Sequence, residues 1–301
     1  MKRKNIILVI IFVVLGVIGY VLTRGLPWQQ GKPRFFPKIE ADSLTQIVIN
    51  TFGTGEVRLE KEDSRWVVLS AENTPANQDR VDDVIRTTVE LTREDLISTN
   101  PEKHVNLKVD GSGTRVMVYQ GESLAADYYI GQVGPDFYST YVRKEGEEQV
   151  YLVYRVLTSV VNPLEWRDLA VFDFNSNDVI TVGVEYEGQV YKLEKKDDMW
   201  IISGDVRKVD SSKVQDFVYQ LASLTADDLK MDVDAGKSGL DISNWRYAVT
   251  LSNGMIYELV IGSKDEEVGF YVLSSGSAIT YLIPASTIDE FPKGVDTVSA
   301  D

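Results

Sequence analysis

Apolar and polar positions follow the same order twice along this chain. The stretches LEKEDSRW (59–66) and LEKKDDMW (193–200) share five of eight letters and lie 134 positions apart. Residues 77–96 and 210–229 also resemble each other, at a spacing of 133 positions. Matching segments keep their order to the end of the chain, and each copy is longer than a solenoid repeat of about 20–50 residues. We therefore predict a duplicated unit of domain size.

Each copy predicts the same series of elements. A β-branched run, QIVIN (46–50) or VITVGVEY (179–186), predicts an opening strand. A charged hairpin then leads into a strand headed by Trp66 or Trp200, which we expect to anchor a helix to the sheet. After this helix, four strands form a meander and a short apolar helix ends the copy. The prediction is thus a three-stranded piece, a crossing helix and a four-stranded meander.

The helix of each copy carries both a cap and an apolar face. Asn77 and Asp210 are placed as N-caps, where a short polar side chain can accept from free backbone N–H groups. Apolar residues then recur at the spacing of one helix face. In the first copy they are Val81, Val84, Ile85 and Val89, and in the second Val214, Phe217, Val218 and Leu221.

These elements predict an α+β fold, in which two tandem homologous repeats of mostly antiparallel sheet plus helix follow an N-terminal transmembrane helix. We place the first repeat at residues 43–172 and the second at 173–298. Residues 1–24 form the cytoplasmic tip and the anchor, and residues 25–42 are a juxtamembrane linker.

The N-terminus predicts the membrane anchor. Three basic residues, Lys2, Arg3 and Lys4, precede Ile6–Leu22, which contains no charge. Seventeen helical residues span roughly 25 Å, adequate for a bilayer core with snorkelling flanks. A cleaved signal peptide is the alternative, but it would have a shorter apolar core and a small-residue cleavage site, which 23–30 (TRGLPWQQ) does not offer. The basic tip predicts a cytoplasmic N-terminus and an extracytoplasmic globular part.

Charge and cysteine content narrow the classes of partner and chemistry. Acidic residues outnumber basic ones 46 to 31, for a net charge of −15, which disfavours nucleic acid as a partner. The chain has no cysteine and one histidine, so zinc sites and cysteine nucleophiles are excluded. The histidine, His104, has no G-x-S-x-G motif to join in a triad, and we interpret it as a solvated loop residue.

Three further motifs resemble ligand-binding or catalytic sequences, but each is better explained as a structural element. AGKSG (235–239) lacks the first glycine of a phosphate loop, because Met231 stands there, and predicts a turn before a strand. Asp232 and Asp234 begin a calcium-loop pattern that fails at Gly236 and at Ser243, although a looser cation site stays open.

The third motif is a pair of neighbouring carboxylates that occurs in both copies. Glu94/Asp95 and Asp227/Asp228 could serve a glycosidase, but they fall at equivalent helix ends and indicate repeated surface structure. The 15 tyrosines lie largely in predicted strands, where an exposed row could bind glycan or peptide.

The series of an N-terminal anchor, a charged hairpin, a Trp-led strand, a helix, GLD (239–241), a strand ending in IG and a late YL resembles the domain of unknown function 4340 family. The resemblance covers roughly residues 40–295. The first copy departs from it by carrying HVNLKVD (104–110) in place of GLD. Proteins of this family are bacterial and membrane-anchored, and many are associated with ABC-type transport systems of the gliding-motility kind, so the resemblance implies an auxiliary extracytoplasmic component.

We therefore expect a single-pass membrane protein without catalysis, held in the lipid bilayer through Ile6–Leu22, that is a scaffold or auxiliary component of an ABC-type transport complex. Its partners would be the membrane subunits of that transporter. We predict no catalytic residue, no cofactor and no bound metal. The alternative is an extracytoplasmic module that binds glycan or cell-wall polymer. A hydrolase would require a cluster of carboxylates in a pocket.

Overall fold

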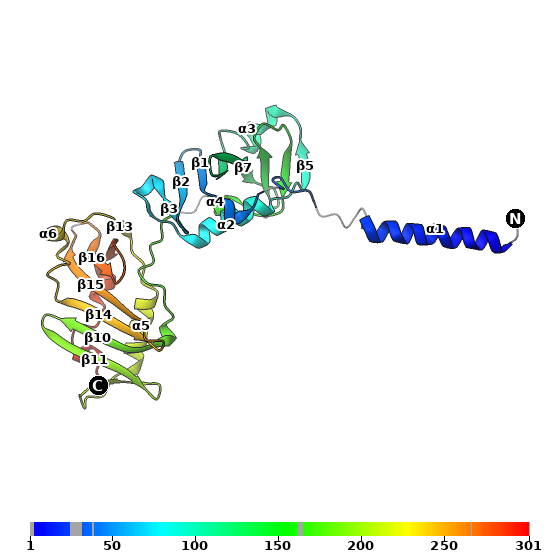
Figure 1. Ribbon diagram of the computed structural model, residues 1–301. Coiled ribbons are helices and arrows are strands. Elements are labelled where there is room, and N and C mark those ends of the chain that lie inside the picture. The colour runs from blue at the N-terminus through cyan, green and yellow to red at the C-terminus, as the bar shows by residue number, and fades with distance from the viewer. Residues whose placement is uncertain (1–2, 25–31, 38, 162–164, 266, 301) are drawn as a thin grey trace. The chain divides into compact units, whose positions relative to one another are not determined.

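A computed structural model shows an α+β protein whose chain divides into two compact units, residues 1–166 (unit 1) and 167–301 (unit 2). Each unit contains one antiparallel sheet and one long helix whose apolar face is buried, and unit 1 also includes the N-terminal helix (Figure 1). The structure describes residues 3–24, 32–37, 39–161, 165–265 and 267–300, and in the first helix it describes the side chains of residues 10–20 only.

The first helix, α1 (Arg3–Arg24), contains most of the predicted anchor. Every residue from 10 to 20 is exposed, including Phe12 at 80% and Leu15 at 60%. The other side chains of Ile6–Leu22 lie outside the described ones. Among the described residues, no helix combines the length and the hydropathy that a membrane crossing needs.

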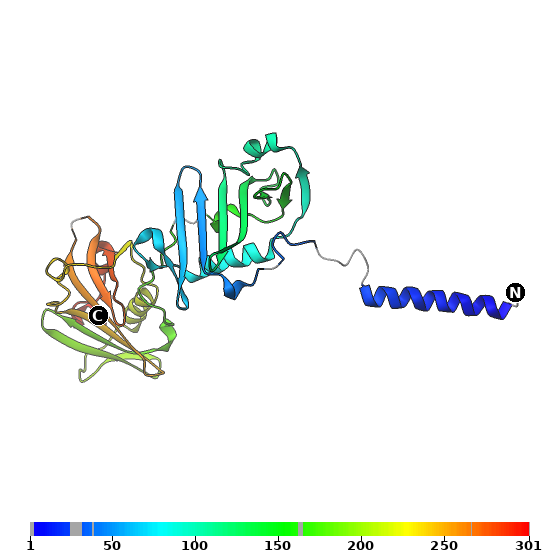
Figure 2. The same cartoon turned by 45° about the horizontal axis from the view of Figure 1, so that its top comes forward.

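Unit 1 forms a nine-stranded sheet among its described residues, in the order β4-β3-β2-β1-β6-β7-β8-β9-β5. In Figure 2 the blue strands of the first hairpin lie beside the green strands of the second half of the sheet. Its elements are β1 (Gln46–Thr51), β2 (Gly55–Glu62), β3 (Arg65–Val68), β4 (Thr74–Pro75), α2 (Gln78–Glu90), β5 (Asp95–Ser98), α3 (His104–Leu107), β6 (Thr114–Gln120), β7 (Ser123–Val133), β8 (Thr140–Lys144), β9 (Val150–Val153) and α4 (Thr158–Val161).

Unit 2 repeats this order in eight described strands, β12-β11-β10-β14-β15-β16-β17-β13. Strand by strand, β10 corresponds to β1, β14 to β6 and β13 to β5. Its elements are β10 (Val179–Tyr186), β11 (Gln189–Lys196), β12 (Met199–Ile202), α5 (Ser211–Ala222), β13 (Asp228–Lys230), α6 (Ala235–Ser238), β14 (Trp245–Leu251), β15 (Ile256–Lys264), β16 (Gly269–Ser274), β17 (Thr280–Pro284), α7 (Ala285–Asp289) and α8 (Val295–Val298).

The helices α2 and α5 have the predicted caps and faces. Asn77 accepts from the backbone N–H of Arg80, and Asp210 accepts from those of Ser212 and Lys213. Of the eight predicted face residues, all are buried except Val89, which is half-buried. These faces pack in the same hydrophobic clusters as Trp66 and Trp200, which are 4% and 3% exposed. The prediction that each tryptophan joins helix and sheet is confirmed.

The predicted three-stranded piece and four-stranded meander of each copy lie in one antiparallel sheet. Strand β1 pairs with β6 through six residue pairs, and β10 pairs with β14 through seven, with a register shift between Val179 and Thr181. A short strand after each long helix, β5 or β13, closes the far edge. Only Asp95–Ser98 and Asp228–Lys230 form these strands, and runs of three or four residues lack a clear apolar period.

A segment ahead of each repeat also belongs to the core. Phe35 and Phe36 are 2% and 6% exposed, although they fall within 25–42, which we had predicted to be linker. The backbone N–H of Phe35 donates to Leu91, just as that of Val171 in unit 2 donates to Leu224. Each unit therefore begins with an apolar segment that hydrogen-bonds to the chain just after its long helix.

Candidate functional site

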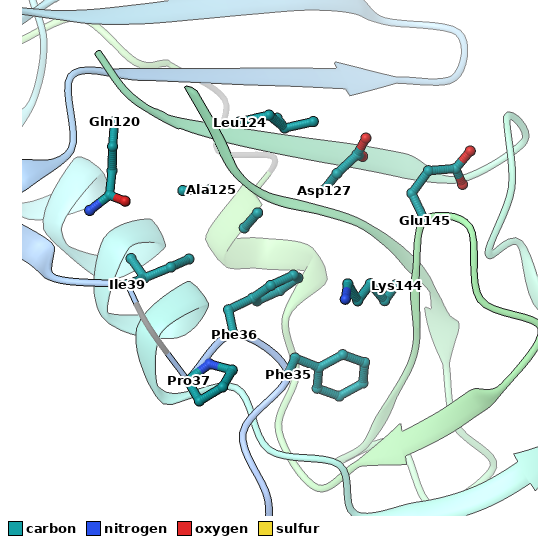
Figure 3. A pocket seen from close by; sticks show the side chains of 11 residues that line it. Phe35, Phe36, Pro37, Ile39, Gln120, Leu124, Ala125, Asp127, Lys144 and Glu145 are labelled. Atoms are coloured by element: carbon teal, nitrogen blue, oxygen red, sulfur yellow. The ribbon is translucent and has the colours of Figure 1, made fainter. Parts of the chain in front are cut away.

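An open pocket lies in unit 1 and has a volume of about 620 Å³. This volume lies within the range of about 300–1,000 Å³ that is typical of ligand pockets. Figure 3 shows Phe36 and Ile39, from the leading segment, on one side of the space and Leu124 and Asp127, from β7, on the other. The remaining lining residues are Phe35, Pro37, Gln120, Ala125, Ala126, Lys144 and Glu145.

The floor of this pocket is the apolar core of unit 1. The Phe36 ring packs at 5.5 Å, centroid to centroid, against Tyr128, which is fully buried. The Tyr128 hydroxyl is 2.8 Å from the Thr88 hydroxyl, and burial raises the pKa of Tyr128 to about 12. Behind Phe36 the core is therefore apolar, and the Tyr128 hydroxyl there is already hydrogen-bonded to Thr88.

Charged side chains form the rim, and most of them have partners within the unit. Asp127 accepts two hydrogen bonds from Arg115, at 2.9 and 2.6 Å, and this pairing raises the pKa of the Arg115 guanidinium. Glu145 accepts from Arg143 at 3.0 Å. Lys144 lies 3.3 Å from Glu147, and its ammonium group is 5.9 Å from the centre of the Phe36 ring. The pocket thus combines an apolar floor with a half-exposed cation at its edge.

No motif in the sequence points to these residues. Their apolar members fit ordinary core patterns, and Lys144 carries no motif. One signal was available, because an alignment of the two copies places Ala126 opposite Tyr257, a small residue opposite an aromatic one.

A family model described as "Domain of unknown function (DUF4340)" matches residues 66–241, more than half of the chain. The chain belongs to the DUF4340 family. No curated protein matches it. The DUF4340 match begins at Trp66 and ends at Asp241, the last residue of GLD. It includes the pocket residues on β6, β7 and β8, and leaves out the leading segment that carries Phe36.

GLD, the motif that carried the resemblance, has a structural counterpart in unit 1 of this DUF4340 chain. Gly239 follows α6 with a φ of +62°, and Lys108 follows α3 with a φ of +55°. Lys108 therefore corresponds to the glycine of GLD in backbone conformation, although glycine is the residue that adopts it at least cost.

The glycine of the IG motif also has a structural reason. A β-carbon at Gly131 would lie 2.2 Å from the carbonyl oxygen of Leu107, and one at Gly262 would lie 2.1 Å from that of Ser238. Both distances are too short for non-bonded atoms. The strands β7 and β15 therefore need glycine where the end of a short helix packs against them.

Most candidate residues named from sequence are separate from the pocket. His104 is half-buried and begins α3, where we had expected a loop, and its Nε2 is 3.0 Å from the carbonyl oxygen of Glu148. AGKSG forms the helix α6 and its cap, where we had expected a turn. Asp234 accepts from the backbone N–H of Lys237 and so caps this helix.

The acidic pairs lie on or beside the edge strands β5 and β13, which corrects their placement at helix ends. Asp95 accepts from the hydroxyl of Tyr154 at 2.5 Å, and Asp228 is 2.7 Å from Arg167. Each of these carboxylates thus has a structural role at the sheet edge. Over the described residues, we find no group of three or more His, Cys, Asp or Glu side chains that could hold a metal ion.

Proposed function

We propose that this DUF4340 protein is a membrane-anchored, extracytoplasmic scaffold without catalysis, an auxiliary component of an ABC-type transport complex. The observation that carries the proposal is α1, a helix of 22 residues whose described side chains are all exposed. Such a helix extends about 33 Å, close to the thickness of a bilayer core of about 30 Å. In water its exposed apolar residues would be unfavourable, whereas in lipid they would be solvated.

Charge supports the proposed orientation. Lys2, Arg3 and Lys4 lie on the short N-terminal side, which the positive-inside rule assigns to the cytoplasm. The two units would then face outward. With a net charge of −15, the chain as a whole would be repelled by anionic headgroups.

We further propose that units 1 and 2 descend from one duplicated ancestor. The shared strand order, the paired caps at Asn77 and Asp210, and the pair of glycines under short helices support this. Duplication of a structural unit would give a transport complex two similar surfaces. The family resemblance supports an ABC-type system as the partner.

The anchor can be tested with single cysteines, because the chain contains none. Val206 is fully exposed in unit 2, so Val206→Cys should react with a membrane-impermeant maleimide on intact cells. Lys2→Cys should react only after the cells are opened. Labelling of both sites in intact cells, or of neither, would contradict the proposed orientation, and recovery of the chain in the soluble fraction would contradict the anchor. Co-purification of ABC-type membrane subunits in mild detergent tests the partner.

Binding of glycan or cell-wall polymer is a second candidate, favoured by two exposed aromatic residues. Phe137 and Tyr138 are 79% and 77% exposed on the loop between β7 and β8, and Phe137 has a φ of +63°. Aromatic faces stack on sugar rings, and backbone strain of this kind is often found at binding sites. A glycan array with the full chain and with Tyr138→Ala tests it, and equal signals from both proteins would contradict it.

A further inference from the structure

The pocket in unit 1 has an equivalent position in unit 2, which can be located by register. In unit 1 Val118 pairs with Ala126, and in unit 2 Val249 pairs with Tyr257. These pairs occupy the same place on equivalent hairpins, because the next pairs on the same face of the sheet are Val116 with Tyr128 and Tyr247 with Leu259. Tyr257 therefore stands where unit 1 has Ala126.

Unit 2 fills this position with its own aromatic rings. Phe172, Phe174 and Tyr257 contact one another with centroid separations of 5.5, 5.8 and 5.1 Å. Phe172 corresponds to Phe36, because both follow the backbone contact to the end of the long helix. Phe174 corresponds to Ile39, because each lies two residues before a short 3-10 helix, Ser176–Asp178 or Ala41–Ser43. Unit 1 thus keeps one of the three rings and has a pocket beside it.

The cation at the rim also distinguishes the units. Glu145 donates its backbone N–H to Asp127, and Ser275 donates its own to Glu258, so Lys144 corresponds to Ser274. Unit 1 therefore has a half-buried cation, paired with Glu147, next to the space that Tyr257 fills in unit 2. A cation beside an apolar pocket favours an aromatic occupant over an aliphatic one, since the ring face attracts positive charge.

An open strand edge borders the same pocket. Strand β7 begins at Ser123, but its pairing with β8 starts at Tyr128 with Lys144. Among the strands that the structure describes, residues 123–126 pair with β6 alone. An unpaired edge offers backbone hydrogen bonds to an extended chain, and a neighbouring pocket then selects a side chain of that chain.

We propose that the pocket of unit 1 binds an aromatic side chain, Phe or Tyr, from an extended segment of a partner protein that lies along the 123–126 edge of β7. The guest ring takes the place that Tyr257 takes in unit 2, on Phe36 and within reach of Lys144. This inference deepens the proposed scaffold role and rests on it, because it supplies the site through which the scaffold holds its partner.

The test uses the full chain in nanodiscs of neutral lipid, and three acetylated, amidated pentapeptides with Phe, Tyr or Leu at the centre of a Ser/Thr background. Binding is measured by ligand-observed NMR. We expect the Phe and Tyr peptides to bind about fivefold more tightly than the Leu peptide, the size expected for a cation–π contact at a partly exposed site. Equal affinities for Phe and Leu would overturn the proposal.

Two variants keep the result interpretable. Ala126→Tyr fills the pocket as unit 2 does and should weaken binding of the Phe peptide at least 10-fold. If Lys144 crowds the new ring, the double variant Ala126→Tyr, Lys144→Ser reproduces the residues of unit 2 at both positions. Retained thermal stability of either one shows that the fold is intact. The matched control, Thr250→Val in unit 2, should change nothing. Unchanged affinity in a folded Ala126→Tyr variant would overturn the proposal.

The result of the peptide titration can be distinguished from a failure of the membrane proposal. If the chain does not insert into nanodiscs, the anchor fails, and the same titration is run with the full chain in buffer. The aromatic preference is expected there as well, because the pocket residues lie in unit 1 and outside α1.

Discussion

Units 1 and 2 share the order of eight strands, and each has a short helix ahead of the meander, yet they fill one end of their cores differently. What they share concerns the backbone: capped helices, tryptophans between helix and sheet, and glycines under helix ends. What separates them is a small set of side chains, with Tyr257 and Phe174 in one unit opposite Ala126 and Ile39 in the other. The comparison teaches that the shared features maintain the fold, while the differing ones leave room for binding.

The largest expected effect comes from the shared tryptophans. Trp66→Ala and Trp200→Ala should each lower the free energy of unfolding of their own unit by about 3–5 kcal/mol, as removal of a buried indole leaves a cavity. Both side chains are almost fully buried, so the two losses should be similar. Hydrogen exchange resolved by peptide measures each unit separately, with Val206→Ala as the exposed control. A loss below about 1 kcal/mol in one unit alone would break the equivalence of the tryptophans.

A second prediction concerns the glycines under α3 and α6. Gly131→Ala and Gly262→Ala should each cost about 2–3 kcal/mol, because the added methyl group overlaps a carbonyl oxygen and the backbone must shift. The control is Gly111→Ala, since a β-carbon there meets nothing within 4 Å. Chemical denaturation measures the three variants. If Gly111→Ala proved as costly as the other two, close packing would not be the reason for these glycines.

A smaller effect on stability is expected at Gly239 and Lys108, which are different residues with the same left-handed backbone conformation. Gly239→Ala should lower the free energy of unfolding by about 1 kcal/mol, the cost of a left-handed conformation for a residue with a β-carbon. Lys108→Gly should raise it by about 0.5 kcal/mol, because the removed strain exceeds the added freedom of the unfolded chain. Thermal melts compare both with the wild type. Destabilisation by Lys108→Gly would mean that the lysine side chain contributes more than its strain costs.

The smallest effect concerns acid stability. The Tyr271 hydroxyl and the backbone N–H groups of Glu267 and Val268 lower the pKa of Asp265 to about 2 from 3.8. A lowered pKa in the folded state gives stability that is present above the unfolded pKa and is lost as the pH falls from about 4 to about 2. Asp265→Asn should therefore have a lower melting temperature than the wild type at pH 7, and the difference between the two melting temperatures, the gap, should narrow below pH 4. A gap independent of pH would show that the charge of Asp265 is not involved.

Asp136 allows the same comparison in unit 1. Its hydrogen bond from Ser139 lowers the pKa of its carboxyl group, so Asp136→Asn should show a gap of the same sign. If Asp136→Asn instead melted above the wild type at pH 7, the carboxylates of Asp136 and Asp265 would not stabilise their loops in the same way.

Much of the fold could be predicted from sequence, because each pattern occurs twice along the chain. The caps at Asn77 and Asp210 and the apolar faces of α2 and α5 follow strong local patterns. Because each pattern occurs in both copies, the two predictions support each other. The union of two pieces into one sheet could not be predicted in the same way. It depends on pairing between β1 and β6, which are more than 60 residues apart, and no local pattern specifies a partner at that distance.

The candidate site was not predicted, for a different physical reason. A pocket is defined by side-chain volume that is missing, and Ala126 in a strand is an ordinary residue by itself. Its meaning comes from Tyr257 at the same register in the other unit. The leading segment with Phe35 and Phe36, which we predicted to be linker, is short and contains Pro33 and Pro37, and its contact with the end of α2 shows that it is core.

The most direct test of this account exchanges the two filling residues. A Phe peptide carrying a photoreactive benzoyl group on its ring is crosslinked to the wild type and to the double variant Ala126→Tyr, Tyr257→Ala, and the sites are mapped by mass spectrometry. We predict crosslinks around Phe36 and Leu124 in the wild type and around Phe172 and Ile256 in the exchanged chain. Crosslinks that stay at the same place in both proteins would contradict the claim that the small side chain of Ala126 opens the binding pocket of unit 1.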